Sequence, residues 1–329
     1  MKNGFTLIEL LATIIILSVI VLIAIPVVNN IIIDSENKAY SETKENIKAA
    51  ANLYILRNMA LAPKTIGATS IVTIQTLKDE GLLKVNIFDP RTDKAITNGD
   101  VVITLNTHES FDFAYYTRNY TTSGLLLLYD GLNHGAINTV WTDLSGNNNH
   151  GSLANFNFDV TSGWTNNYLQ ADGVNDVAKT ASFASLTNLT FELVMSRSTT
   201  NNITWTTGSN TIIIYPAGTT YVQSNSGAIA NGATFTITNN TIYTLTVVYD
   251  VTTQKSLYYQ NGSLVKTFTL PAASATFAFV SGQNIFTNAG STAGNFAQGK
   301  VYSTRMYNRI LTSSEIYDNY KVDKDRFNF

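Results

Sequence analysis

The sequence contains no cysteine among its 329 residues. This absence excludes disulfide bonds, metal sites built on thiolates and cysteine nucleophiles. The folded parts of the chain must therefore be held together by burial of apolar side chains and by hydrogen bonding between strands.

Charge is also scarce, because charged residues make up 13% of the chain and the formal net charge is −2. Lysine and arginine are not gathered into a basic stripe anywhere in the sequence. Attraction to phosphate groups or to anionic lipid over long range depends on such a stripe, so we expect no nucleic-acid partner.

The sequence also lacks the usual catalytic signatures. Its three histidines, His108, His134 and His150, are scattered, and no nucleophile-elbow motif is present. Glycosidases built on a β-sandwich need two carboxylates that face each other. Glu192 has no acidic neighbour at alternating positions of its predicted strand. We therefore predict that the protein is not an enzyme.

What the chain does have is a long apolar run from Phe5 to Ile25. As a helix this run spans about 30 Å, which is the thickness of a bilayer core. Glu9 is its one charged residue, and a carboxylate there would cost about 2.5–3.5 kcal/mol at mid-bilayer, which indicates a function. Cleavage after Gly4 would free an α-amine on Phe5, on the same helical face as Glu9. Pro26 is expected to kink or interrupt the helix.

The segment from Gly4 to Leu11, followed by the apolar helix, resembles the class III signal of type IV pilins and pseudopilins. The resemblance implies that a prepilin peptidase cleaves after Gly4, that the new amino terminus at Phe5 is methylated, and that Glu9 helps to set the register of subunits in a filament. An ordinary secretory signal or an uncleaved anchor would account for the apolar run. Neither would account for Glu9.

The length of the chain predicts two globular parts beside the helix. Charged side chains are dense between residues 34 and 118 and sparse from 119 to 299, which indicates two different modules joined by the polar stretch at 119–124. The expected segments are a leader peptide at 1–4, a transmembrane assembly helix at 5–29, its soluble continuation at 30–62, a small pilin β head at 63–121 and a jelly-roll domain at 122–329.

The first module is expected to pack a small sheet on the soluble part of the helix. An apolar stripe on that helix comprises Tyr40, Ile47, Ala51, Tyr54 and Leu61. After it, the sequence predicts a short helix at Ile71 to Leu83 and strands at Val101 to Leu105 and Phe111 to Tyr116. This region resembles the reduced sheet of a small pilin head.

In the second module, β-branched and aromatic runs alternate with clusters of Asn, Gly, Ser and Thr, which is typical of a β-sandwich. Asn261-Gly262 predicts a type I′ hairpin turn, and Thr312 with Glu315 predicts a capping box that opens a final helix. The predicted strands are Leu189 to Met195, Thr211 to Tyr215, Thr234 to Thr238, Tyr243 to Tyr249, Ser256 to Gln260 and Ser263 to Leu270.

Five stretches, taken in their order along the chain, resemble the laminin G-like, concanavalin A-like jelly roll of bacterial surface proteins: Leu128 to Asn133, Trp141 to Gly151, Tyr168 to Gly173, Thr190 to Val194 and Arg305 to Leu311. The resemblance implies a module that binds glycans or protein surfaces, in some members through calcium. The expected fold class is therefore α+β: a long N-terminal transmembrane pilin helix with a small pilin β-sheet, followed by an all-β jelly-roll sandwich.

Two groups of oxygen-bearing side chains are candidates for a calcium site, since calcium takes six to eight oxygen ligands. The first is Asp143 with Asn147 and Asn148, and the second is Asp172 with Asp176. The alternative is that these side chains satisfy their own backbone in Asx turns.

The candidate glycan-binding residues are four aromatic side chains surrounded by Asn and Thr: Trp141, Trp164, Trp205 and Tyr215. An exposed aromatic ring suits a sugar ring, but aromatic side chains also dominate sandwich interiors, so core packing is the alternative for each.

Two functions stay open. One is a pilin-like subunit of a cell-surface filament that presents a lectin-like module for adhesion to a carbohydrate or surface protein. The other is a structural or minor pseudopilin of a secretion or DNA-uptake apparatus with a non-binding jelly-roll cap. Both imply other pilin subunits and a prepilin peptidase as partners. Both also imply a cytoplasmic-membrane precursor with a cytoplasmic N-terminus that ends in an extracellular pilus or pseudopilus.

Overall fold

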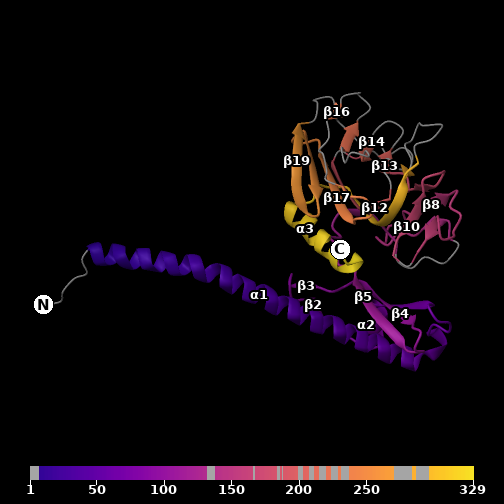
Figure 1. Cartoon of the computed structure of the whole chain (residues 1–329), viewed down its shortest axis with the longest axis horizontal. Coiled ribbons are helices and arrows are strands. Elements are labelled where there is room, and N and C mark those ends of the chain that lie inside the picture. The colour runs from indigo at the N-terminus through magenta and orange to yellow at the C-terminus, as the bar shows by residue number, and fades with distance from the viewer. Residues whose placement is uncertain are drawn as a thin grey trace. The chain divides into compact units, whose positions relative to one another are not determined.

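The computed structural model describes residues 7–131, 138–165, 167–183, 186, 188–198, 203–206, 211–214, 220–223, 229–230, 237–269, 284–286 and 296–329. The chain divides into two compact units, Met1–Asn119 and Tyr120–Phe329. Each unit is described by itself. Figure 1 shows the first as a long helix with a small sheet and the second as a β-sandwich with one helix at its C-terminal end.

The first unit is organised by the helix α1, Leu7–Arg57, which runs without a break through Pro26. The expectation of an interruption at Pro26 is therefore wrong. The remaining elements of the unit are η1 (Met59–Leu61), β1 (Thr69–Thr73), α2 (Ile74–Asp79), β2 (Phe88–Asp89), β3 (Lys94–Ala95), β4 (Gly99–Leu105) and β5 (Phe111–Thr117).

An antiparallel sheet in the order β1-β4-β5 covers the C-terminal half of α1. Ile47, Ala51 and Ile55 of the helix pack against Val101 and Ile103 of β4. The predicted apolar stripe is therefore confirmed in its central part, while Leu61 is exposed. The strands predicted at 101–105 and 111–116 are also confirmed.

The helix predicted at Ile71 to Leu83 is shorter than expected. Residues Thr69–Thr73 form β1, which pairs with β4, and α2 starts only at Ile74. Thr73 caps that helix by accepting a hydrogen bond from the backbone N–H of Thr76. The local sequence of residues 71–73 also suits a helix, but pairing with β4 makes these residues part of a strand.

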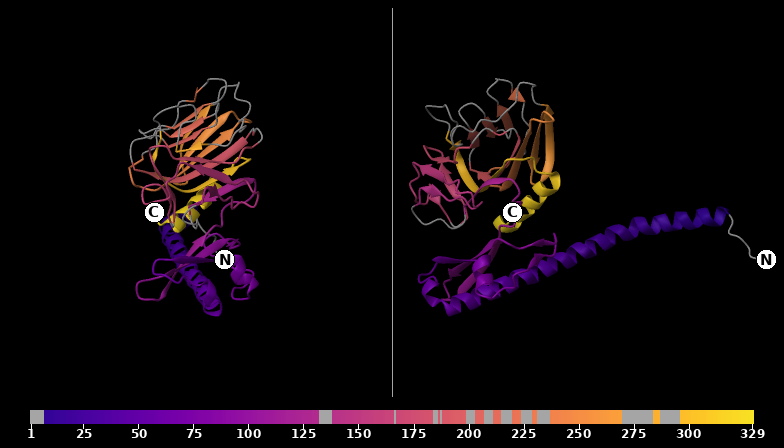
Figure 2. Two further views of the ribbon diagram at one scale, coloured as in Figure 1. Left: turned by 90° about the vertical axis from the view of Figure 1, so that its right-hand side faces the viewer. Right: turned by 180° about the vertical axis from the view of Figure 1, so that it is seen from behind.

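The second unit contains, in its described residues, two antiparallel sheets of eight strands each. Figure 2 shows these sheets from two further sides. The first sheet has the order β19-β18-β17-β12-β21-β10-β9, with β6 also paired to β21, and the second has the order β16-β15-β14-β13-β20-β11-β8-β7. This antiparallel sandwich has the jelly-roll architecture that the sequence predicts.

The bounds of the first sheet's strands are β6 (Leu125–Asp130), β9 (Gly163–Trp164), β10 (Leu169–Asp172), β12 (Asn188–Arg197), β17 (Tyr243–Asp250), β18 (Lys255–Gln260), β19 (Ser263–Thr269) and β21 (Gln298–Tyr307). Those of the second are β7 (Val140–Trp141), β8 (Gly151–Ala154), β11 (Val177–Lys179), β13 (Ile203–Thr206), β14 (Thr211–Ile214), β15 (Thr220–Gln223), β16 (Ile229–Ala230) and β20 (Asn284–Ile285).

The main core of the sandwich contains Trp141, Phe191, Tyr249 and Phe286, all buried. Five of the six strands predicted in this unit are present, with ends that differ by one or two residues. The sixth, at Thr234 to Thr238, lies partly outside the described residues, and Thr238 is not in a strand.

The predicted turn and cap are both confirmed. Asn261 and Gly262 have φ angles of 51° and 75°, as a type I′ turn requires. Thr312 and Glu315 form a complete capping box at the start of α3, Ser313–Phe327. This helix packs on the first sheet through a second cluster that includes Val248, Tyr259 and Ile316.

Candidate functional site

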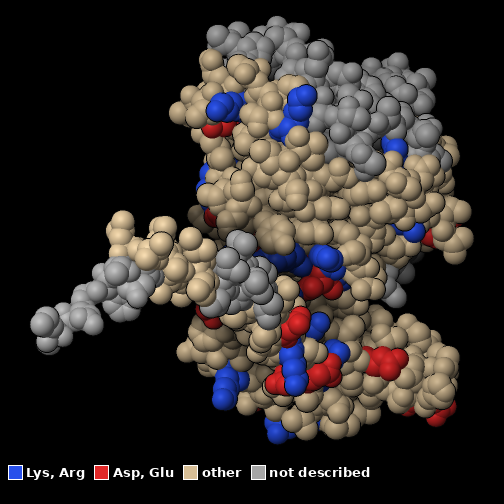
Figure 3. All heavy atoms as spheres, turned by 60° about the vertical axis from the view of Figure 1, so that its left-hand side comes forward, with Lys and Arg blue, Asp and Glu red and all other residues tan. Residues whose placement is uncertain are grey.

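The N-terminal part of α1 is an apolar surface that no other described part of its own unit covers. Leu7 is 87% exposed, Leu17 and Ile31 are each 62% exposed, and other large aliphatic residues between them are similarly open. The described atoms of this stretch carry no charged side chain in Figure 3. Such a surface favours contact with other apolar surfaces.

Of the residues predicted to act in processing and assembly, Gly4 and Phe5 lie outside the described residues. Glu9 lies in the first turns of α1, and its side chain is outside the described part. Within the part of the chain that the structure describes, no helix combines the length and the hydropathy that a membrane crossing needs.

Trp141 is fully buried in the main core of the sandwich. Its indole N–H donates a hydrogen bond to the backbone oxygen of Asp130 at 3.0 Å, and its ring stacks on Tyr129 with centroids 5.2 Å apart. No face of this ring is open to a sugar. The ligand role expected for Trp141 therefore does not fit its position, and core packing explains it.

Trp164 is only half-buried, at the end of β9. Its indole N–H donates to the backbone oxygen of Asn138 at 2.7 Å, and its ring meets that of Trp141 edge to face at 5.6 Å. Trp164 is thus anchored, and the residue as a whole is partly exposed. Trp205 lies in β13 opposite Ile285, with its side chain outside the described part, and Tyr215 lies outside the described residues.

The Asp143 carboxylate is saturated by its own loop. Oδ1 accepts hydrogen bonds from the backbone N–H groups of Leu128 and Ser145, and Oδ2 accepts from the N–H of Asn149 and the hydroxyl of Ser145. The Asn147 amide donates to the backbone oxygen of Leu125. This is the turn chemistry that the sequence leaves open, and it fastens the loop to β6.

Asp172 is the last residue of β10, and Asp176 lies in the turn that leads to β11. The backbone N–H of Asp172 donates to Oδ2 of Asp176 at 2.7 Å, and the hydroxyl of Ser162 donates to Oδ1 at 2.9 Å. Within the described ranges, no three Asp, Glu or His side chains gather as a metal site. Neither predicted group therefore forms a carboxylate-rich cage in the described structure.

Burial raises the pKa of Asp176 from 3.8 to about 6, with a further contribution from the neighbouring carboxylate of Asp172. Because the folded state binds this proton more tightly than the unfolded state, the resulting stabilisation is complete below about pH 4 and is lost as pH rises through 6. We expect Asp176→Asn, which keeps an acceptor and cannot ionise, to be more stable than wild type at pH 7. The two proteins should converge near pH 4 in urea unfolding, and a constant difference between them across that range would contradict this assignment.

Sequence reasoning missed a buried ionic cluster, which we call the Arg305 network. The Arg305 guanidinium donates to Glu192 at 2.7 Å through Nε and to both oxygens of Asp323 at 2.8 and 2.7 Å through Nη1 and Nη2. All three side chains are fully buried. The Asn319 amide donates to Glu192 at 2.8 Å. Strands β12 and β21 and helix α3 are thereby joined by charge-assisted bonds.

The Arg305 network also holds the first residue of the second unit. The Tyr120 hydroxyl donates to Oδ1 of Asp323 at 2.8 Å, and the Arg305 guanidinium lies 4.0 Å from the centre of the Tyr120 ring. Arg326 forms a further buried ion pair with Asp130 of β6. The first residue and the C-terminal helix of this unit are therefore fastened to the same sheet.

Within the network, the Glu192 carboxylate is fully buried and paired with Arg305. Burial raises the pKa of the Glu192 carboxyl above its ordinary value, and the Arg305 charge offsets this rise only in part. Burial alone would lower the pKa of Arg305, but attraction to Asp323 and Glu192 raises it above its ordinary value. The carboxylates of Glu192 and Asp323 both pair with Arg305, and both are buried away from solvent. The only sign of this network in the sequence was one glutamate, Glu192, in a mostly apolar strand and one arginine, Arg305, in another.

Comparison with known proteins identifies the N-terminal segment. Residues 1–25 match the family model described as the prokaryotic N-terminal methylation motif. No curated protein matches the sequence. The chain thus joins a prepilin-type N-terminal segment to a jelly-roll domain.

Solved structures resemble the fold at low identity. A Trypanosoma rangeli sialidase in complex with 2,3-difluorosialic acid is 12% identical over 68% of this chain and 42% of its own, with a TM-score of 0.43. Domain 4 of AbnA, an extracellular arabinanase from Geobacillus stearothermophilus in complex with arabinotriose, is 17% identical over 60% of this chain and 98% of its own, with a TM-score of 0.44. The ligand-binding domain of botulinum neurotoxin serotype D, with N-acetylneuraminic acid, is 12% identical over 61% of this chain and 51% of its own, also with a TM-score of 0.44. The chain spans less than half the length of the sialidase.

Proposed function

We propose that this chain, which carries a prepilin-type methylation motif, is a type IV pilin-like subunit of a cell-surface filament. The observation that carries the proposal is the motif at residues 1–25, continued by a helix whose apolar side chains are uncovered. The precursor inserts in the cytoplasmic membrane with its N-terminus in the cytoplasm, and a prepilin peptidase removes residues 1–4. The subunit then assembles with other pilin subunits through α1.

Glu9 has a specific part in this proposal. After cleavage, the α-amine of Phe5 and the carboxylate of Glu9 stand four residues apart, so they can pair on one helix face or between neighbouring subunits. In an apolar bundle an unpaired charge costs several kcal/mol. Registers that leave either group alone are therefore penalised.

The first test is the N-terminus of the mature protein. We expect Edman sequencing or mass spectrometry of the filament-associated protein to find a chain that begins at Phe5 and carries a methyl group on its amine. Gly4→Val should leave the precursor uncut, because a larger side chain blocks the peptidase. A mature chain that begins at any other residue would refute the proposal.

We propose further that the jelly roll is a non-catalytic, lectin-like module that binds a glycan or a glycan-bearing surface protein. The half-buried Trp164, held by Asn138 and followed by the polar Thr165, supports this role. Glu192 and Asp323 are not placed to hydrolyse a glycosidic bond, because both carboxylates form buried ion pairs with Arg305.

A glycan array with the full chain, run with and without calcium, tests the lectin role. Binding should fall at least tenfold in Trp164→Ala and stay unchanged in Tyr317→Ala, which removes an exposed aromatic ring on α3. No binding to any glycan, together with a filament defect when residues 122–329 are deleted, would favour the alternative of a structural pseudopilin with a non-binding cap.

A further inference from the structure

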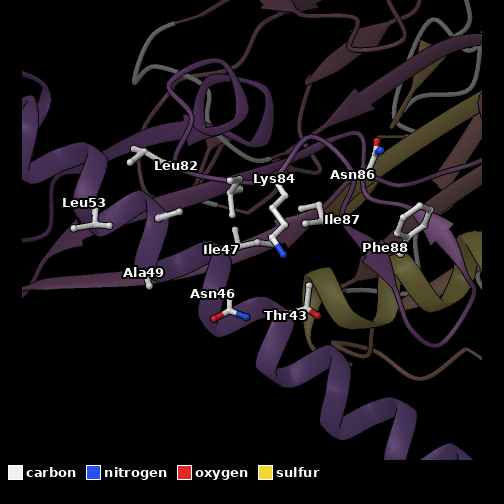
Figure 4. Close-up of a pocket in the computed structure, with 12 residues that line it drawn as sticks. Thr43, Asn46, Ile47, Ala49, Leu53, Leu82, Lys84, Asn86, Ile87 and Phe88 are labelled. Atoms are coloured by element: carbon white, nitrogen blue, oxygen red, sulfur yellow. The ribbon is translucent and has the colours of Figure 1, made fainter.

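The first unit contains a groove of about 520 Å³ between α1 and the segment Leu82–Phe88, lined by both apolar and polar side chains. Its floor is formed by buried Ile47 and Ala50, and its two ends by Leu53 and Phe88, which are 49% and 52% exposed. Figure 4 shows Thr43, Asn46, Ala49 and Leu53 lining it from α1, with Leu82, Lys84, Ile87 and Phe88 opposite them.

One charge lies in this groove. The Lys84 side chain extends from the segment Leu82–Phe88 toward α1 in Figure 4. Among the described residues, none forms a hydrogen bond or an ion pair with its ammonium group. A groove with an apolar floor and one unpaired cation best fits an apolar segment that ends in a carboxylate.

The chain itself carries such a segment. Residues Ile31, Ile32 and Ile33 of α1 are all about half exposed or more, and the exposed Asp34 follows them. Asp34 likewise has no ion pair with any described residue. Because Ile31 and Asp34 are three residues apart, they lie on neighbouring parts of one helix face.

We propose that the groove binds residues 31–34 of a second copy of this chain, with Ile31 beside Phe88 and Asp34 paired to Lys84. This inference rests on the proposed filament function and names one of its contacts. If Asp34 of one copy lies level with Asn46 of the other in parallel helices, the copies are shifted by about twelve residues, or about 18 Å along the axis. The contact is head-to-tail, so each copy donates one segment and accepts another.

The absence of native cysteine makes disulfide trapping a direct test. In the full chain, expressed with a prepilin peptidase and oxidised in assembled filaments, Asp34→Cys/Lys84→Cys should give a covalent ladder beyond dimers. Either single variant can give dimers at most. Lys84 lines the groove together with Asn46, which is twelve residues, or about 18 Å along α1, from Asp34 of the same copy. A disulfide needs Cα atoms within about 7 Å, so we expect no bond within one copy.

The control pairs Asp34→Cys with Lys64→Cys, an exposed lysine that does not line the groove. It should give no ladder. If wild type forms filaments but the Asp34/Lys84 pair gives no ladder, the docking inference is overturned and the filament function stands. If wild type forms no filament and its mature chain does not begin at Phe5, both fall.

Two further pairs of variants separate docking from folding. Ala49→Phe fills the groove and should lower filament incorporation at least fivefold, whereas Asn52→Phe, at an exposed asparagine of the same helix outside the groove, should not. Asp34→Lys and Lys84→Glu should each lower incorporation about fivefold, and the double variant should recover it. Equal loss in all four single variants, or no recovery in the double variant, would contradict the proposed pairing.

Discussion

Replacing Arg305 with methionine is expected to destabilise the second unit by about 3–5 kcal/mol, because Glu192 and Asp323 would then be buried without a counter-ion. Methionine fills much of the same volume, so the loss reports charge rather than a cavity. All three tryptophans of the chain follow residue 120, and their fluorescence in urea therefore follows this unit alone.

The matched control is Arg309→Met. Arg309 also pairs with a carboxylate, that of Glu315 at 2.6 Å, but both side chains are more than a quarter exposed. Solvent screens such a pair, so its loss should cost about 1 kcal/mol or less. A triple variant, Arg305→Met with Glu192→Gln and Asp323→Asn, should regain most of the lost stability. If Arg305→Met and Arg309→Met unfold at the same urea concentration, the buried Arg305 network contributes no more to the stability of the second unit than the exposed Arg309–Glu315 pair does.

The network illustrates which features the sequence can predict. The strand that carries Glu192 and the helix that carries Asp323 were both predicted, the helix from its capping box, but the strand β21 that carries Arg305 was not. Their meeting depends on a register in which Glu192 lies directly opposite Arg305 across β12 and β21. The two positions are more than a hundred residues apart, and no local pattern specifies that pairing.

The candidate ligand residues show the same limit. A tryptophan in a polar context has the same sequence signal whether it is buried like Trp141 or partly open like Trp164. The two indoles touch each other, and only the three-dimensional position of each ring separates core from surface. Asp143 is similar, since an Asp followed by Asn residues suits both a calcium loop and an Asx turn.

The N-terminal segment is the opposite case, because neighbouring residues in the sequence are enough to identify its motif. The motif that residues 1–25 match is one continuous stretch of sequence, which contains Gly4, Phe5 and Glu9 and the start of the apolar helix. The helix α1 was predicted in place, although the effect of Pro26 was not. In a long apolar helix the missing N–H of one proline can be tolerated without ending the helix.

Glu9→Ala is expected to leave export and cleavage after Gly4 intact but to lower incorporation into filaments by about 100-fold or more. The reason is that the free amine of Phe5 would then enter an apolar helix bundle without its counter-ion, at a cost of about 3–5 kcal/mol. The measurement compares two fractions of the same cells: the mature chain in the membrane and the mature chain in sheared filaments.

Two variants control for the charge and for the helix. Glu9→Gln keeps the length and a hydrogen-bond acceptor but removes the charge, so it should fall between wild type and Glu9→Ala. Glu42→Ala removes an exposed carboxylate from the C-terminal half of α1 and should assemble normally. Normal incorporation of Glu9→Ala would show that the carboxylate does not select the register. Failure of Glu42→Ala to the same degree would show that the loss reflects the helix rather than a buried pair.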